Sequence, residues 1–458
     1  MPGASDPIAR EAVTRILARY LVSSHPREVP ANARHEGKRA FLHWMGCAIG
    51  GSRNDAVVRS LAAFTPYSGA PRATILGRSE RADALLASLV NGIAADVLGF
   101  SDTHLRTVIH AGGVVGPVVA ALSEQNAHTG EDALHAFLLG VEVACRVGVG
   151  VYTWHYGRGW HITGTAGTFG AAAAAGILLR LDEREMAWAL SMAATQAAGL
   201  RELFGSMGKS LHCGRAAQNG FASALLAKSG YTSSVSGIEG ARGFAYVLGD
   251  KPDLAAITDG LGTRFEILAN TYKPFPCGIV IHPVIDGCIA LHADHVTHED
   301  HVKSVALSVN PLVLELTGRR NPQSTSEAKL SVYHSAAAAL VAGRVTEQEY
   351  TTETLHDARL TRLAERITAT ASSAIREDEA IVTIELNDGR ILRHHVEHAV
   401  GSEQRPMSDA DIERKFSGLA EPYLAADRIP RIISACWNME QLEDAGAPIR
   451  LCAGREPA

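Results

Sequence analysis

Apolar residues recur with the period of an α-helix along more than half of the chain, from Ile8 to about Phe265. One helix is predicted to begin after Thr129, because Asp132 three residues later completes the pattern of a capping box. Its apolar face is predicted to contain Leu134, Phe137, Leu138, Val141, Ala144 and Cys145. This region therefore predicts a compact helical bundle and not an array of alternating strands and helices.

A second helix is predicted to begin after Asp182, with Glu185 in the same capping relation. Its apolar face contains Met186, Ala189, Leu190, Ala193, Ala194 and Ala197, and the alanines make small side chains dominant on it. Small side chains let two helix backbones approach closely, so we expect this helix to pack tightly against a neighbour.

The pattern changes after Tyr272, where short strand-like runs begin to alternate with helical stretches. Strands are predicted at residues 305–309, 381–386 and 391–396. The last two flank an Asn-Asp-Gly-Arg sequence at 387–390, which is typical of a hairpin turn. Helices are predicted at 331–342 and 357–367. This region therefore predicts a smaller α+β domain.

Helical periodicity returns at Ser408, where Asp411 stands three residues later. We expect this tail to pack back onto the first helical region. The predicted fold is mostly α: a large all-helical domain built from both chain ends, residues 1–268 and 400–458, plus a smaller α+β lid domain, residues 269–399.

Composition limits the classes of function. Of the 458 residues, 20% are charged and 46% hydrophobic, and the formal net charge is −6, which disfavours nucleic acid as a partner. Seven cysteines without a C-x-x-C pair are typical of reduced thiols. Residues 1–15 contain no apolar signal-peptide core, and the apolar stretch 163–179 is too short to span a membrane. We therefore expect a cytoplasmic protein without a membrane partner.

Five motifs carry the chemistry. The most distinctive, Gly-Trp-His-Ile-Thr-Gly-Thr-Ala-Gly-Thr-Phe-Gly, occupies 159–170. The others are Ser101-Asp102-Thr103-His104 with His110, Gly208-Lys209-Ser210-Leu211-His212-Cys213-Gly214-Arg215, Lys273-Pro274-Phe275-Pro276-Cys277 with His282 and Asp286, and Tyr333 in a Leu-Ser-Val-Tyr-His-Ser-Ala run. Together and in this order, over about residues 10–440, they resemble the MmgE/PrpD family, which includes dehydratases, a decarboxylase and an epimerase of small carboxylates.

The resemblance implies a helical domain, an inserted lid domain, a homodimer and a cleft lined by residues of these motifs. The predicted catalytic residues are His161, Lys273, Tyr333 and Asp102, and the predicted substrate-binding residues are Thr103, His110, Lys209, His212 and His282. We expect His161 to transfer the proton at carbon, and Lys209 with His110 to hold carboxylates. Lysine and histidine suit an anionic substrate, because they supply cations and proton carriers near neutral pH.

Each residue also has a purely structural explanation. His161 precedes a packed helix, Lys209 follows a glycine in what is otherwise a loop pattern, and Tyr333 lies on an apolar helix face. The chain also departs from relatives that carry D-x-D-D-T-H, since Gly99 and Ser101 replace two of the acidic residues. That departure weakens the transfer of any particular substrate from the family.

The predicted function is that of a cofactor-free lyase, a dehydratase or decarboxylase, acting on a small di- or tricarboxylate through proton transfer at carbon. The alternative within the family is an epimerase that removes and returns an α-proton. A histidine cluster at His292, His295, His298 and His301 is the one candidate for a metal-dependent hydrolase, but its polar surroundings lack an apolar shell. We expect no metal and no cofactor. A non-catalytic binding protein is a further alternative, which the number of polar motif residues disfavours.

Overall fold

The computed structural model describes residues 12–295 and 299–455, and it confirms a mostly helical fold with a smaller α+β part. The chain divides into two compact units. Unit 1 comprises residues 1–97, 101–270 and 409–458, and unit 2 comprises residues 98–100 and 271–408. We describe each unit by itself.

Unit 1 is a bundle of helices drawn from both ends of the chain. Its helices are α1 (Val13–Ser23), α2 (Ala31–Gly51), α3 (Asp55–Phe64), α4 (Ala84–Val97), α5 (Ala111–Gln125), α6 (Gly130–Gly157), α7 (Ile162–Leu178), α8 (Glu183–Gln196), α9 (Gly208–Lys228), α10 (Phe244–Val247), α11 (Leu254–Thr258), α18 (Asp409–Ala420), α19 (Arg428–Trp437) and α20 (Gly446–Leu451). Its strands are the two-residue β1 (Ala73–Thr74), β2 (Arg81–Ala82) and β3 (Thr103–His104). The two-residue strand β4 (Asn270–Thr271) lies where the chain passes into unit 2.

Both predicted capping boxes are present. The Thr129 hydroxyl accepts the Asp132 amide at 3.1 Å at the start of α6, and the Asp182 carboxylate accepts the Glu185 amide at 2.8 Å at the start of α8. These side chains satisfy backbone amides that have no partner within the helix. The two helix starts predicted from the sequence are therefore confirmed.

Helix α6 is buried on nearly all sides, not only on its predicted face. By length and composition it could span a membrane, but 94% of its apolar window is buried inside the protein, which is typical of a core helix. Helix α7, which contains the apolar stretch 163–179 up to Leu178, is also buried, as the sequence predicts.

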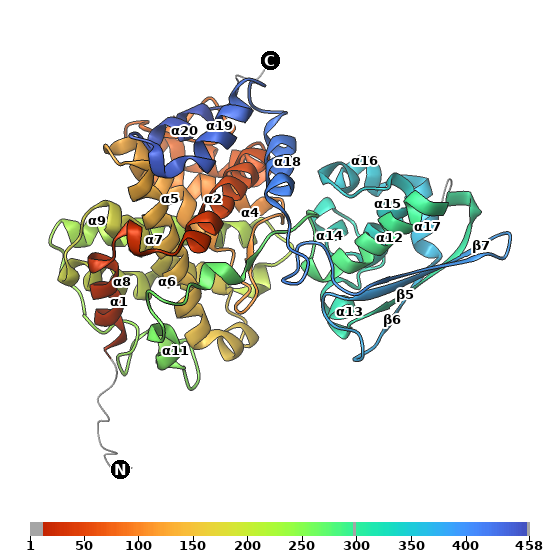
Figure 1. Ribbon diagram of the computed structural model, residues 1–458, viewed down its shortest axis with the longest axis horizontal. Coiled ribbons are helices and arrows are strands. Elements are labelled where there is room, and N and C mark those ends of the chain that lie inside the picture. The colour runs from red at the N-terminus through yellow and green to blue at the C-terminus, as the bar shows by residue number, and fades with distance from the viewer. Residues whose placement is uncertain (1–11, 296–298, 456–458) are drawn as a thin grey trace, which may run out of the picture. The chain divides into compact units, whose positions relative to one another are not determined.

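The C-terminal helices pack against the N-terminal ones. Helices α18 and α19 contact α2, and α20 contacts α5, so the blue and red segments of the chain lie side by side (Figure 1). This arrangement follows from the apolar stripe of each helix; in α18 the stripe comprises Ile412, Phe416 and Ala420. Unit 1 is thus closed by the last fifty residues of the chain, Asp409–Ala458.

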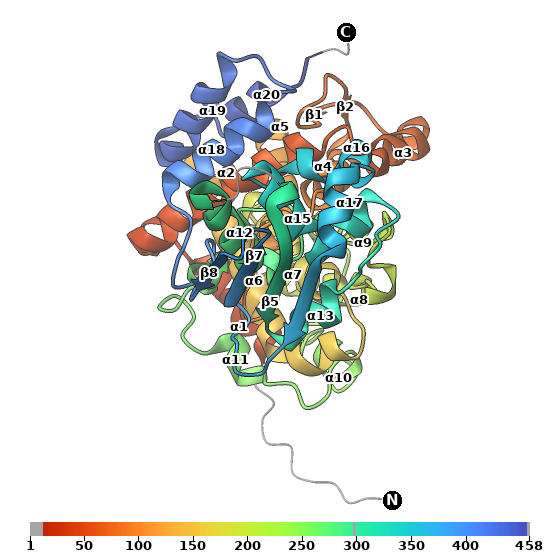
Figure 2. The ribbon, with the colours of Figure 1, turned by 90° about the vertical axis from the view of Figure 1, so that its right-hand side faces the viewer.

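Unit 2 contains a four-stranded sheet in the order β6-β5-β7-β8. The strands are β5 (Val302–Val309), β6 (Ile367–Ala371), β7 (Ala380–Leu386) and β8 (Ile391–Val396). The helices are α12 (His282–His295), α13 (Pro311–Thr317), α14 (Thr325–Ala328), α15 (Val332–Ala342), α16 (Thr352–Leu355) and α17 (Ala358–Glu365). Helix α12 packs on β7 and β8, while α15 packs on α12, α17 and β6 (Figure 2).

The hairpin β7–β8 and strand β5 confirm the predicted strands, but one prediction at the edge of the sheet is wrong. The helix predicted to run to Ile367 ends at Glu365, and Ile367 begins β6, which pairs in parallel with β5. Strand β6 is a short edge strand in which two threonines and one alanine are exposed, so it shows little of the apolar alternation that marks a strand.

Candidate active site

An ion pair between a buried carboxylate and a lysine lies at the centre of the polar residues of unit 1. The Lys209 ammonium donates to both carboxylate oxygens of Asp96, at 2.7 and 2.9 Å. The Ser210 hydroxyl donates to Asp96 Oδ2 at 2.8 Å. Asp96 is 2% exposed near the end of α4, and Lys209 lies in the first turn of α9. Sequence analysis predicts a role for Lys209 but does not find its partner.

The close approach of α4 and α9 explains this pairing. A Cβ added to Gly92 would lie 2.8 Å from the Gly214 Cα, so only glycines let these two helices come so close. Gly92 lies one turn before Asp96, and Gly214 lies about one turn after Lys209. The glycine crossing therefore brings the carboxylate and the ammonium together.

Two histidines lie next to this pair. His161 is the N-cap residue of α7, and its Nδ1 lies 3.0 Å from Nδ1 of His212, which comes from α9. The His161 ring also stacks edge-on against Phe204, with centroids 4.9 Å apart. Gly199 has a φ of +146°, and a Cβ there would lie 3.2 Å from the His212 ring, so a side chain at Gly199 would disturb both histidines.

Both imidazoles are held in the neutral form. Burial lowers the pKa of His161 well below its usual value, and the nearby Lys209 charge adds to this effect, while Asp96 opposes it. Burial also lowers the pKa of His212, against the opposing charge of Asp96. A hydrogen bond between two neutral Nδ1 atoms needs one donor and one acceptor. The donor ring therefore has a bare Nε2 and the acceptor ring has an Nε2–H, so the pair contains one further hydrogen-bond acceptor and one further donor.

Lys209 strongly affects the ionisation of Asp96. Burial by itself raises the pKa of Asp96, but the charge of Lys209 and the hydrogen bond from its ammonium outweigh burial and hold that pKa well below its usual range. Asp96 is therefore a carboxylate at neutral pH. Electrostatic interactions and hydrogen bonds join six residues, which we call the site cluster: Asp96, Lys209, Ser210, His110, His161 and His212.

His110 is oriented by the loop before α5. Its Nδ1 donates to the Asp102 carbonyl at 2.6 Å, since a carbonyl can only accept, and Thr103 Oγ1 lies 3.4 Å from the same nitrogen. The His110 backbone amide donates to Thr163 Oγ1 at 3.1 Å. In a neutral ring this leaves Nε2 without a proton. The predicted neighbours Thr103 and His110 are thus brought together.

Asp102 was predicted as a catalytic residue, and its carboxylate has structural partners. It accepts hydrogen bonds from the Gly112 amide and the Asn270 side chain, both at 3.1 Å. Burial raises its pKa. These bonds attach the loop to the first turn of α5, so Asp102 positions His110 through its backbone carbonyl.

Three residues of the site cluster lie at helix N-termini: His110 before α5, His161 before α7 and Lys209 in the first turn of α9. These helices pack against one another in unit 1. The N-terminal end of a helix carries partial positive charge and exposed amides, and so favours anions. Combined with the lysine and the histidines, the arrangement suits a carboxylate ligand.

The remaining predicted residues belong to unit 2. The Lys273 ammonium donates to the Gly99 carbonyl at 3.3 Å, and His282 packs edge-on against Phe275 at 5.4 Å. Tyr333 lies at the start of α15 beneath the Arg320 guanidinium, which is 4.2 Å from its ring centre. Tyr333 and Arg320 line a cavity of about 570 Å³ in unit 2. The predicted roles of Lys273, His282 and Tyr333 stay predictions.

The two positions that depart from the family pattern have their own structural roles. Gly99 has a φ of +66°, in the left-handed region that favours glycine, and its carbonyl accepts the Lys273 ammonium. The Ser101 hydroxyl donates to the Ala95 carbonyl at 2.8 Å at the end of α4. Here a backbone carbonyl and a hydroxyl stand where the family pattern has carboxylates.

Asp96, Ser210 and Thr163 are the residues of this region that sequence analysis missed. A signal for Asp96 was present, because it is the one charged residue in the apolar sequence of α4. A charge on an apolar helix is costly to bury without a partner, so its presence predicts one. Nothing in the sequence identifies Lys209 as that partner.

No group of three or more His, Cys, Asp or Glu side chains suited to a metal ion occurs among the described residues. Of the histidine cluster, His298 and the side chain of His295 lie outside the described residues. The Nδ1–H of His292 donates to the Leu340 carbonyl at 2.7 Å. All seven cysteines are buried, and none of them forms a disulfide.

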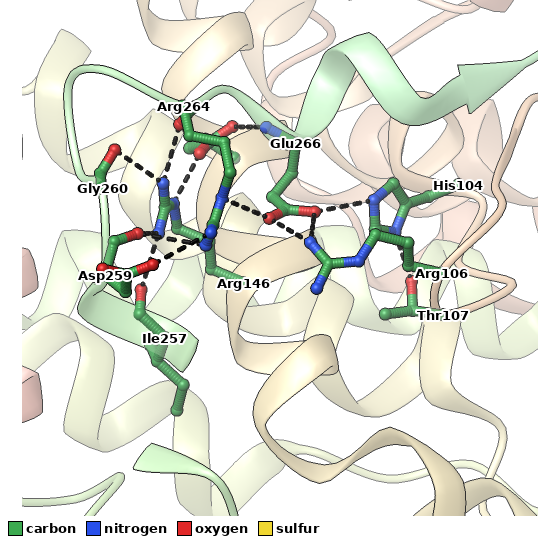
Figure 3. Close-up of polar contacts among 10 residues, drawn as sticks. His104, Arg106, Thr107, Arg146, Ile257, Asp259, Gly260, Arg264 and Glu266 are labelled. Atoms are coloured by element: carbon green, nitrogen blue, oxygen red, sulfur yellow. Dashed lines mark hydrogen bonds and ion pairs between the residues drawn. The ribbon is translucent and has the colours of Figure 1, made fainter. Parts of the chain in front are cut away.

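A second buried set of charges in unit 1 lies around Arg146 (Figure 3). We call it the anchor network, and it comprises Glu142, Arg146, Glu266, His104, Arg106 and Arg264. Arg146 donates to Glu142 at 2.5 Å and to four backbone carbonyls, those of Ile257, Asp259, Gly260 and Arg264. It thereby holds the segment 257–264 against α6.

Comparison with known proteins identifies the family of the chain. The family model described as the MmgE/PrpD N-terminal domain matches residues 15–256, and that of the MmgE/PrpD C-terminal domain matches residues 275–439. The chain belongs to the MmgE/PrpD family.

Several full-length relatives carry one name. The chain is 26% identical to cis-aconitate decarboxylase of Mus musculus over 91% of its own length and 88% of the relative. It is 26% identical to cis-aconitate decarboxylase of Homo sapiens, covering 92% and 90%. It is 24% identical to cis-aconitate decarboxylase of Aspergillus terreus, covering 99% of both chains.

Proposed function

We propose that this chain is a lyase that removes carbon dioxide, or water, from a small di- or tricarboxylate by proton transfer at carbon, without a cofactor. The observation that carries the proposal is the hydrogen-bonded pair of neutral histidines, His161 and His212, beside the Lys209–Asp96 ion pair. Relatives named cis-aconitate decarboxylase support decarboxylation as the first reaction to test.

In this mechanism, carboxylate groups of the substrate bind at the N-termini of α5, α7 and α9. The remaining N–H of Lys209 and the backbone amides at these helix starts supply the hydrogen bonds there. Binding at three separate helix starts fixes the orientation of the reacting carbon, which lowers the entropic part of the barrier.

Proton transfer is assigned to His161. When a carbon–carbon bond to a carboxylate breaks, its electron pair stays on the remaining carbon, which then takes a proton from an acid. A bound carboxylate raises the pKa of a nearby histidine, because it stabilises the protonated ring. Substrate binding would therefore offset the low pKa of free His161 and charge it as an acid when it is needed.

The test is proton NMR of the purified protein in deuterated water with cis-aconitate, citrate, 2-methylcitrate and a set of hydroxy- and amino-dicarboxylates. A lyase yields new olefinic signals or loss of a carboxylate, and His161→Ala and Lys209→Ala abolish the change. If the folded protein leaves every compound unchanged, this substrate class is wrong.

The same experiment detects the epimerase alternative as deuterium incorporation at an α-carbon without net loss of substrate. An epimerase needs proton carriers on opposite faces of one carbon. Homodimerisation and a cytoplasmic location stay predictions.

A further inference from the structure

The lysine of the site cluster is not an isolated cation. An ammonium group has three N–H donors, and Lys209 directs its ammonium at both oxygens of Asp96. One N–H remains for a ligand. The lysine side chain is 25% exposed and Asp96 only 1%, so the ammonium lies between the carboxylate and solvent.

The negative charge of Asp96 also acts on the histidines of the site cluster. The Asp96 carboxylate interacts electrostatically with His110, His161 and His212 as well as with Lys209. Because the Asp96 carboxylate is ionised, its charge balances that of the Lys209 ammonium, and the pair contributes no net charge. His161 and His212 contribute none while they are neutral.

We propose that Asp96 is a specificity-determining residue that restricts the site to ligands with two carboxylates and disfavours a third. The proposal rests on the proposed function and names its substrate class. A third carboxylate is attracted to the site only by a positive charge that no other group balances. The Lys209 ammonium would supply such a charge, but the Asp96 carboxylate balances it. A dicarboxylate can still bind to the remaining Lys209 N–H and to the helix N-termini.

Two probes separate charge from shape. Glutarate and propane-1,2,3-tricarboxylate share a three-carbon chain and differ by one carboxylate. Their dissociation constants are measured by titration calorimetry on the full-length protein at about pH 8, where all the carboxylates are ionised. The quantity of interest is the ratio of the two constants, because a general loss of structure weakens both probes alike.

Three variants form a charge series. Asp96→Asn keeps the shape of the side chain and frees the lysine charge, so relative affinity for the tricarboxylate should rise about tenfold. Lys209→Met leaves Asp96 unbalanced, so the ratio should move about tenfold the other way. The double variant Asp96→Asn with Lys209→Met restores a neutral pair, and its ratio should return to within about twofold of wild type.

Opposite shifts in the two single variants, cancelled in the double variant, support the proposal. If Asp96→Asn fails to fold, the opposite shift in Lys209→Met and its reversal in the neutral double variant give the same answer. If the ratio of the two dissociation constants is unchanged in Asp96→Asn, which retains Lys209, then Asp96 does not determine specificity. The proposed function still stands in that case. If Lys209→Met alters the binding of neither probe, the cluster is no carboxylate site, and both proposals fall.

Discussion

The site cluster and the anchor network of unit 1 both bury charge, but they satisfy it differently. In the anchor network all five N–H groups of Arg146 have acceptors, one carboxylate and four carbonyls. In the site cluster Lys209 has one donor beyond its bonds to Asp96, and the histidine pair contains a bare nitrogen and an N–H.

The comparison teaches how to separate structural from functional charges in a buried setting. A fully bonded guanidinium fixes a loop and has no remaining donor for a ligand. Neutral histidines of lowered pKa next to an ion pair can still gain or lose a proton. The hydrogen-bond donors and acceptors that remain unused therefore say more about function than the presence of buried charge does.

The largest effect is expected from breaking the anchor network. Arg146→Met removes the partner of buried Glu142 and of four carbonyls, so the free energy of unfolding should fall by about 3–5 kcal/mol. Urea denaturation measures this loss. Arg106→Met is the matched control, because its side chain is 47% exposed and its loss should cost about 1 kcal/mol or less. Equal effects of the two variants would contradict the distinction.

A substitution in the site cluster should instead lower activity more than stability. His161→Ala is expected to lower kcat by about 10²–10⁴-fold, because it removes the proton carrier, with little change in the urea midpoint. His104→Gln changes a buried histidine of the anchor network and should affect stability more than kcat. If the two variants lowered kcat equally, His161 would have no special role.

Another buried histidine, His135, belongs to neither set. His135 bonds to the Ser24 hydroxyl, and burial lowers its pKa to about 4, with a smaller contribution from His25 and opposition from Asp132. The folded state thus binds fewer protons than the unfolded state between about pH 6.5 and 4.

The stability that neutral His135 contributes is complete above about pH 6.5 and is lost as the pH falls to about 4, a change of about 3 kcal/mol. Denaturation curves across this range should be steeper in pH for wild type than for His135→Gln. Identical slopes would show that the unprotonated ring is not what burial stabilises.

The smallest effect is expected at Asp102. Asp102→Ala leaves the Gly112 amide and the Asn270 side chain without an acceptor and should cost about 1–3 kcal/mol of stability. Asp102→Asn retains an acceptor oxygen and should recover most of that loss. An Asp102→Asn variant that is stable yet as inactive as His161→Ala would instead establish a catalytic carboxylate.

Much of the fold could be predicted, because its signals are local. Thr129 with Asp132 and Asp182 with Glu185 satisfy the amides of their own helices, and the Asn-Asp-Gly-Arg turn at 387–390 joins adjacent strands. Strand β6 was missed, since its pairing with β5 joins residues far apart and its own side chains are largely exposed.

The candidate site was only partly predictable. The motifs identified His161, Lys209 and His212, which the structure places together, but they gave no indication of Asp96 or of a histidine–histidine hydrogen bond. Such features depend on side chains from different helices meeting, and no single segment contains that information.

The sequence by itself determined the helices, the hairpin, the family and the supply of cations and proton carriers, because periodicity, capping and motif order are properties of neighbouring residues. Only the tertiary structure decided how these groups are paired. Asp96 and Lys209 are 113 positions apart, and they meet because Gly92 and Gly214 let two helices cross closely. Burial at that crossing sets the charge of each group, since desolvation and a partner's charge act only once the helices are packed.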